Sequence, residues 1–343
     1  MTDGAPGAIA PPELTPEIFT TSGLPAARRI ELWESHNAAA LIGLTVRAPD
    51  SLDAAELNVR LPRARLARVT GTAHSVERTR DLILRCPADS VAVFLTLRGE
   101  ARFTADGVAL DRRRGDALAW DADRPFARTF ARGLEELVVT IPWAELAARS
   151  ELHGMTAPIA TSFGAPSATG PALSAGAAGS ARAAGAGRPD QYARALARIA
   201  GRATRDERPL RPDERTVLDL VAAITAGPRV AHAAAHRAVA RSYIEEHLTD
   251  PGLSAAEIAA AAGISERQLS RLFAADGGSV PAHVLGRRLE LAHSVLSAPR
   301  APTVAEVAAR CGFTSAAYFS HAFRYHFGHR AGDLRAAAAA PNS

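Results

Sequence analysis

Two segments in the last third of the chain carry polar side chains at a spacing that places them together on one face of a helix. The first segment is LSAAEIAAAAGISERQLSRLFAADG, in which Arg267, Ser270 and Arg271 fall opposite the leucines and phenylalanine of the same predicted helix. Guanidinium groups donate paired hydrogen bonds to phosphate oxygens and to guanine edges, and a serine hydroxyl can bond to several bases. These residues therefore predict noncovalent contact with the groove of a nucleic acid.

The same arrangement recurs 49 residues later, from Gly263 to Gly312, in the segment TVAEVAARCGFTSAAYFSHAFRYHFG. An alanine on such a face can contact a thymine methyl group, and an arginine can bind phosphate or guanine. The predicted outward positions of this second helix are Ala316, Ala317, Ser320, His321 and Arg324.

Both segments have the residues that a helix-turn-helix requires. Two helices that cross at roughly 90 to 120° over a short turn need a small residue where they touch and a glycine where the turn becomes left-handed. Ala259 and Gly263 fill these positions in the first segment, and Ala308 and Gly312 fill them in the second. One such segment fits a plain helical hairpin equally well, but two in series favour paired nucleic-acid readers.

A predicted helix over residues 280–297 lies between the two segments and has its own apolar stripe. Such a helix would hold the two readers at a fixed separation, as contact with successive major grooves about 34 Å apart requires. The chain has 343 residues, with 47% hydrophobic and 22% charged residues, so we expect a folded protein of about two domains. All 40 basic residues are arginines and the sequence pI is about 9.6, which fits a phosphate-bearing partner.

Residues 55–141 have a different pattern, with short apolar stretches separated by Gly, Pro and Asp. The clearest hairpin is predicted at 101–111, where Asp106-Gly107 supplies the two positive-φ positions of a type I′ turn. Strands at this spacing predict an antiparallel β-barrel or jelly roll, so the fold class is α+β, with an all-α C-terminal part. The apolar residues proposed to line an effector pocket would equally fill a ligand-free core, and both interpretations stay open. They are Val93, Leu95, Phe103, Trp120 and Phe126.

The domain organisation follows from these patterns and from changes in composition. A short helix is predicted at 25–37 and another at 143–152, and amphipathic helices near 190–203 and 213–226 have stripes typical of packing within or between protomers. The predicted divisions are a flexible leader at 1–23, a sensor domain at 24–160, a Gly/Ala/Ser/Pro-rich linker at 161–189, a helical connector and candidate dimerisation element at 190–231, and a nucleic-acid-binding domain at 232–343.

Several function classes lack their sequence signals. The two cysteines, Cys86 and Cys311, fall in different predicted domains and support neither a disulfide framework nor a thiolate zinc site. Between residues 40 and 150 the only histidine is His74, so we expect no metal, no cofactor and no enzyme activity. The N-terminal stretch has no signal-peptide pattern and no segment approaches the roughly 20 apolar residues of a membrane span, which predicts a cytoplasmic protein.

Residues 236–335 resemble the DNA-binding domain of AraC/XylS-family transcription regulators, on Gly263, the connecting helix and the segment CGFTSAAYFSHAFRYHFG. More loosely, GEARFTADGVALDRRRGDALAWDADRPFARTF and the following ELVVTIPWAEL look like the cupin-like ligand-binding domain of many members. Family members usually continue with a proline and a Tyr-Arg pair after the second recognition helix, whereas this chain has HRAGDLR ending at Arg335. That difference puts the phosphate contact or packing of this corner in doubt.

The resemblance implies a bacterial regulator, more often an activator, whose base contacts come from the outward positions named above. The partners it implies are double-stranded promoter or operator DNA, RNA polymerase, a small-molecule effector and a second copy of the chain, without a membrane. Two alternatives are a regulator of the same DNA-binding type that senses no small molecule, and a cupin-like enzyme fused to a helical domain.

Overall fold

The structure is a computed structural model that describes residues 16–150, 152, 154–164, 189–205, 212–226, 232–298 and 300–339. The chain divides into an N-terminal unit, residues 14–239, and a C-terminal unit, residues 240–343. The division falls within helix α6 (His232–Glu246).

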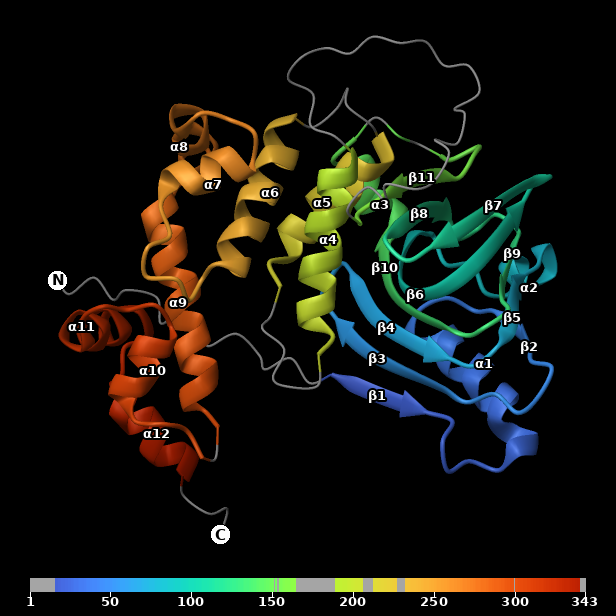
Figure 1. The fold of residues 1–343 in the computed structure, drawn as a ribbon, viewed down its shortest axis with the longest axis horizontal. Coiled ribbons are helices and arrows are strands. Elements are labelled where there is room, and N and C mark those ends of the chain that lie inside the picture. Colours follow the sequence, from blue (N-terminus) through green and yellow to red (C-terminus); the bar gives the residue numbers. More distant parts are fainter. Residues whose placement is uncertain are drawn as a thin grey trace, which may run out of the picture. The chain divides into compact units, whose positions relative to one another are not determined.

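The N-terminal unit is built on an antiparallel curled sheet with helices at its ends and on its outer face (Figure 1). Its main path runs β1-β3-β4-β10-β6-β9-β5-β2, while β7 and β8 pair with β6, and β11 pairs with β8. The strands are β1 (Glu17–Thr20), β2 (Thr45–Arg47), β3 (Ala54–Arg60), β4 (Arg65–Gly71), β5 (His74–Arg78), β6 (Ser90–Ala105), β7 (Val108–Arg113), β8 (Asp116–Asp121), β9 (Phe126–Phe130), β10 (Leu134–Pro142) and β11 (Ile159–Ser162). The helices are the 3-10 turn η1 (Ala26–Arg28), α1 (Arg29–Ala40), α2 (Arg80–Arg85), α3 (Trp143–Ala147), α4 (Pro189–Ala203) and α5 (Glu214–Ala226).

A bulge reverses the side-chain alternation halfway along the long strand β6. The pairing of β10 with β6 shifts between Glu135 and Glu136, and nearby Gly99 has φ +86°. A Cβ at Gly99 would lie 2.4 Å from the carbonyl oxygen of Gly133, so only glycine fits there. Beyond this point the odd-numbered residue Phe103 faces the same interior as Phe94. Both halves of β6 therefore contribute side chains to the same interior.

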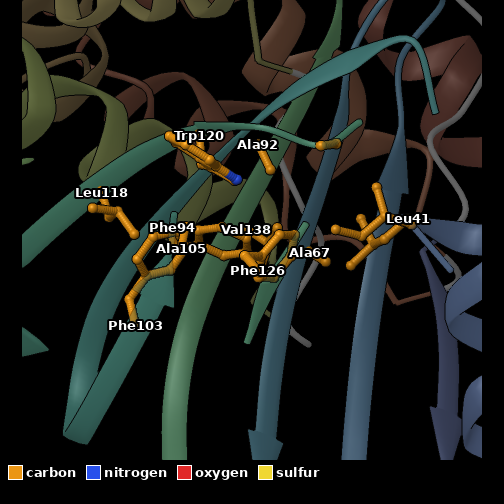
Figure 2. Close-up of a cluster of buried hydrophobic side chains, with 12 residues drawn as sticks. Leu41, Ala67, Ala92, Phe94, Phe103, Ala105, Leu118, Trp120, Phe126 and Val138 are labelled. Carbon is orange, nitrogen blue, oxygen red and sulfur yellow. The ribbon is translucent and has the colours of Figure 1, made fainter. Parts of the chain in front are cut away.

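The interior of the curled sheet is filled by aromatic and aliphatic side chains (Figure 2). The Phe103 ring lies 5.7 Å from the rings of both Trp120 and Phe126, centroid to centroid. The buried Arg128 guanidinium donates hydrogen bonds to both carboxylate oxygens of Glu136 and lies 4.0 Å from the centre of the Phe94 ring. Buried charges need this kind of pairing, because an unpaired ion in an apolar interior is costly.

The predicted hairpin at 101–111 is confirmed, since Asp106 and Gly107 join β6 to β7 with φ angles of 48° and 76°. The antiparallel sheet and the helical C-terminal part confirm the predicted fold class. The predicted helix at 25–37 is present as η1 and α1, and the helix predicted at 143–152 is shorter, ending at Ala147.

Two of the predicted domain boundaries were wrong, the end of the leader and the start of the linker. Residues 17–20 belong to the sheet as β1, paired with β3, so the leader does not extend to 23; its earlier part, residues 1–15, lies outside the described residues. Residues 159–162 form β11 on β8, because their alternating side chains complete a sheet edge, so no linker begins at 161. Residues 165–188 of the predicted linker lie outside the described residues.

The two helices of the predicted connector belong to the N-terminal unit. Helix α4 packs on α5 and on strands β4, β10 and β11. Its stripe residues Tyr192 and Leu196 are buried there, as are Val217 and Val221 of α5. The apolar surface that suggested pairing between protomers is therefore covered within one chain, and a homodimer stays a prediction.

The C-terminal unit is all helical. It comprises the end of α6, then α7 (Ala255–Ala261), α8 (Glu266–Ala274), α9 (Val280–Leu296), α10 (Val304–Arg310), α11 (Ala316–Phe327) and α12 (Ala331–Ala339). Helices α10, α11 and α12 pack around the C-terminal half of α9, with Phe319 and Phe323 fully buried between them. The predicted connecting helix at 280–297 is thus confirmed as α9, and it starts at the cap residue Ser279.

Candidate nucleic-acid interface

The first helix-turn-helix consists of α7, a left-handed turn at Gly263 and α8. The Ser254 and Ser265 hydroxyl groups each accept a hydrogen bond from the backbone NH three residues on. The Glu257 and Gln268 side chains in turn accept one from the backbone NH of the cap residue. Gly263 has φ +68°, the conformation that only glycine adopts without cost. Because both ends of the turn are fixed in this way, α8 leaves α7 in one direction.

The three predicted contact residues of α8 are exposed on one face. Leu269 and Phe273 are buried against the rest of the unit, and Arg267, Ser270 and Arg271 point away from them. In the part of the chain that the structure describes, neither the Arg267 nor the Arg271 guanidinium has an acidic partner or a side-chain hydrogen bond. Both are therefore free to bind an anion or a base edge.

The second helix-turn-helix repeats this design with α10, Gly312 and α11. Thr303 and Glu306 form its capping box, Gly312 has φ +81°, and the Ser315 hydroxyl caps α11 by accepting a hydrogen bond from the Tyr318 NH. Ala308, where the two helices touch, is buried, as predicted. In both copies the alanine is buried and the turn glycine has a positive φ, and the roles assigned to these positions stay predictions.

The five predicted contact positions of α11 are also exposed, but their chemistry differs from that of α8. Ala316 and Ala317 offer only methyl groups, and the Ser320 hydroxyl donates to the Ala316 carbonyl at 2.9 Å, which leaves its oxygen as an acceptor. His321 and Arg324 are the remaining outward groups of this set.

Two tyrosines on α11 escaped the sequence reasoning, which considered only small, polar and basic outward residues. Tyr318 is 55% exposed and Tyr325 is 88% exposed, and their spacing of seven residues places them along one edge of the outward face. A tyrosine carries both an apolar ring and a hydroxyl, so this edge can contact sugar and phosphate. A helical projection of the sequence would have revealed them.

One arginine of helix α9 contacts both the loop before the first helix-turn-helix and the turn of the second. The Arg288 Nε atom donates to the Leu248 carbonyl at 2.8 Å, and Nη2 donates to the Asp250 carbonyl at 2.5 Å, in the loop that leads into α7. The position of a Cβ at Gly312, in the turn of the second segment, would be 3.0 Å from the same Nε atom. Burial lowers the pKa of Arg288. Sequence reasoning expected α9 to act through its apolar stripe only, and missed this contact.

The C-terminal corner, where the chain departs from the family pattern, forms helix α12. Ala331 at its start is buried in the core of the second segment, and the Arg335 Nε donates to the Ala301 carbonyl at 3.3 Å. This corner therefore packs without the usual proline.

The predicted effector residues do not line one site. Phe103, Trp120 and Phe126 meet in the interior of the curled sheet, where they fill the core. Val93 and Leu95 alternate with Ala92 and Phe94 along β6, so they lie on the opposite, outer face, beside Val139 and Leu137 of β10. The sequence placed them together because the bulge at Gly99 was not foreseen.

The described residues contain neither a candidate metal site nor a candidate membrane span. No group of three or more His, Cys, Asp or Glu side chains is placed to hold a metal ion. No helix in those ranges combines the length and apolar character of a membrane span.

Models of two known domain families match this chain. A model of the AraC-binding-like domain matches residues 36–251, more than half of the chain, and a model of a helix-turn-helix domain matches residues 246–337. The transcriptional activator RhrA of Rhizobium meliloti (strain 1021) is 36% identical over 98 residues, 28% of this chain and 31% of that protein. The transcriptional activator NphR of Rhodococcus sp is 38% identical over 92 residues, 27% of each chain.

These alignments span about a third or less of the relatives' own length. Among solved structures, the AraC-like transcriptional activator CuxR is similar with a TM-score of 0.42 and 20% identity, over 80% of this chain and 94% of that one.

Proposed function

Because the chain belongs to the family defined by the AraC-binding-like domain and ends in a helix-turn-helix domain, we propose that it is a sequence-specific DNA-binding transcription regulator. The observation that carries this proposal is the pair of outward helix faces, on α8 and α11, with hydrogen-bonding groups that have no acidic partner among the described residues. In this function the residues bind and position; none performs a covalent step.

Recognition would proceed by insertion of α8 and α11 into successive major grooves of double-stranded DNA. Arg267 and Arg271 on α8 supply the donors that pair with guanine O6 and N7 or with phosphate. On α11 the methyl groups of Ala316 and Ala317 suit thymine, while His321 and Arg324 suit a base edge or the backbone. The chain would therefore read two blocks of sequence about one helical turn apart.

The remaining functional features are proposals of the same kind. Activation is favoured over repression because two similar proteins are named as activators, and RNA polymerase would be the partner. We also propose a cytoplasmic location, no enzyme activity, and control by a small molecule bound to the N-terminal unit. The alternative of a regulator that senses no small molecule is supported by the filled interior around Phe103 and Trp120.

Selection of DNA from a random library with the full chain tests the proposal, followed by binding measurements at several salt concentrations. We expect an enriched motif of two blocks, and loss of that enrichment in the double variant Arg267→Ala/Arg271→Ala. The matched control is Arg102→Ala, which removes an exposed arginine of the N-terminal unit. Salt-sensitive binding without any enriched motif would contradict sequence-specific recognition.

A further inference from the structure

A cavity of about 290 Å³ lies at one end of the curled sheet of the N-terminal unit. Its walls are four short segments: residues 38–43 at and after the end of α1, residues 61–65 before and in β4, residues 86–90 before and in β6, and residues 140–142 at the end of β10. A volume of this size is at the lower end of the range for small-molecule sites, which often occupy the mouths of β-barrels. None of the five residues that the sequence suggested for an effector lines it.

Arg65 brings a positive charge to this cavity. Its Nη1 atom donates to the carbonyl oxygens of Ala39 and Ala40, at 3.1 and 3.0 Å, and so caps the end of α1. Its Nε and Nη2 atoms have no partner among the described residues, and no carboxylate pairs with it there. The Nε and Nη2 edge is one that can bind a carboxylate with two parallel hydrogen bonds. A role in capping alone would use only Nη1.

Two hydroxyl groups accompany the arginine. Thr140 is paired in register with Arg65 across β10 and β4, and Ser90 is paired with Pro142 across β6 and β10. Both residues are largely buried, at 4% and 7% exposure, and both line the cavity. Neither hydroxyl has a hydrogen-bond partner within the described ranges. Neither oxygen is among the fully buried polar atoms that lack a partner, so each can be reached from the cavity by water or by a polar group of a ligand.

Apolar side chains line part of the cavity, and a buried arginine holds its walls in place. Leu41 and Ile42 line the cavity together with the Cys86 thiol. Arg78, fully buried, donates to the Gly43 carbonyl at 2.7 Å and to the Cys86 carbonyl at 2.9 Å, which ties two of the four wall segments together. The second arginine of the lining, Arg63, is already paired with Glu214 and Glu145. The uncompensated charge in the cavity therefore belongs to Arg65.

We propose that this cavity binds a small organic carboxylate, with its anionic group on Arg65 and the hydroxyls of Ser90 and Thr140, and its apolar body against Leu41 and Ile42. The inference rests on the proposed role of the N-terminal unit as a sensor and names the ligand class of that role. It concerns binding to this unit only. Its test needs no DNA, so its failure and the failure of DNA recognition are separate results.

The test uses Cys86 as a reporter. The full chain is alkylated with iodoacetamide, and the modification of Cys86 is followed by mass spectrometry with and without hexanoate or phenylacetate. The uncharged amides, hexanamide and phenylacetamide, are the matched ligand controls. Cys311 is an internal control for folding, because it is buried in the other unit and burial raises its pKa to about 11, which keeps it unreactive while that unit is folded.

We expect at least one carboxylate to slow Cys86 alkylation, and its amide to protect at concentrations roughly tenfold or more higher, since a bond to a charged group contributes about that factor in affinity. Protection should be lost in Arg65→Gln and weakened in Thr140→Val. It should persist in Arg60→Gln, which removes a neighbouring arginine that does not line the cavity. Circular dichroism melting of each variant identifies one that fails to fold.

If the amides protect as well as the carboxylates, or Arg65→Gln folds and is protected as well as the parent chain, the proposal is overturned. If neither carboxylate protects Cys86 at tens of millimolar, it is overturned as well. Should Arg65→Gln fail to fold, Thr140→Val and the comparison of carboxylate with amide decide the result, because neither removes the cap on α1.

Discussion

The two helix-turn-helix segments of the C-terminal unit share a scaffold and differ in what they present. Each has a capping box on its first helix, a buried alanine, a left-handed glycine and a second helix whose inner face is buried and apolar. On the outward faces, Arg267 and Arg271 of the first correspond to Ala317 and His321 of the second. The difference teaches that a few buried positions define the segment, while the outward positions are free to vary with the sequence that is read.

The largest expected difference between the two segments is the loss of stability when the glycine of each turn is replaced. We expect Gly312→Ala to lower the free energy of unfolding by about 2 to 4 kcal/mol, because it combines positive φ with a contact of 3.0 Å to Arg288 and 3.1 Å to the Leu248 carbonyl. Gly263→Ala should cost only about 1 to 2 kcal/mol, since no described residue other than its chain neighbours lies within 4 Å of its Cβ position. Urea unfolding of both variants measures the difference. Equal losses would mean that φ alone decides the cost.

The arginines of the first segment should carry more base recognition than the corresponding residues of the second. Arg271→Ala is expected to cost about 1 to 3 kcal/mol on the selected DNA site and little on random DNA. His321→Ala should have a smaller effect on the same site, because an imidazole forms fewer simultaneous hydrogen bonds than a guanidinium. Fluorescence anisotropy at fixed salt gives both numbers. Uniform weakening on all sequences would assign Arg271 to phosphate instead.

The scaffold of both segments could be predicted from sequence because local rules specify it. A serine or threonine followed three residues later by glutamate or glutamine marks a helix start, and a glycine after a buried alanine marks the turn. The same locality explains the hairpin at Asp106-Gly107. In these elements, residues close in the chain decide the structure.

Features that depend on distant residues were missed. The bulge at Gly99 is set by the approach of the Gly133 backbone, which no local pattern reveals, and it sent Val93 and Leu95 to the wrong face in the predicted pocket. The charge on Arg65 matters because Ala39 and Ala40 use only one of its nitrogen atoms. The strand β1 was missed because its pairing with β3 decides its structure.

Arg288 tests whether the two segments act as one reader. Arg288→Ala removes the contacts to Leu248 and Asp250, so we expect affinity for the two-block site to fall by roughly tenfold. The preference for correct over altered block spacing should fall too, because one of the contacts by which α9 fixes the first segment relative to the second would be lost. Arg288→Lys is the matched variant that keeps the charge but not the two-carbonyl contact. Unchanged spacing preference in a folded Arg288→Ala variant would contradict this role.

The smallest expected difference lies in the residue that precedes each turn glycine, Ala262 in the first segment and Cys311 in the second. Burial raises the pKa of the Cys311 thiol to about 11, above the ordinary value of 9.0 that it regains on unfolding. Between these pH values the unfolded chain has lost this proton and the folded chain has kept it, so the thiol favours unfolding as the pH rises through that interval.

Cys311→Ala gives the second segment the residue of the first and removes the contribution of the thiol to the pH dependence of the unfolding free energy. We therefore expect the parent chain to lose more unfolding free energy than the variant between pH 8 and pH 10, with Cys86 and the remaining titrating groups common to both. Urea unfolding at the two pH values measures the excess. An equal loss in both proteins would show that the thiol keeps its ordinary pKa in the folded state, in contact with water that its 1% exposure does not indicate.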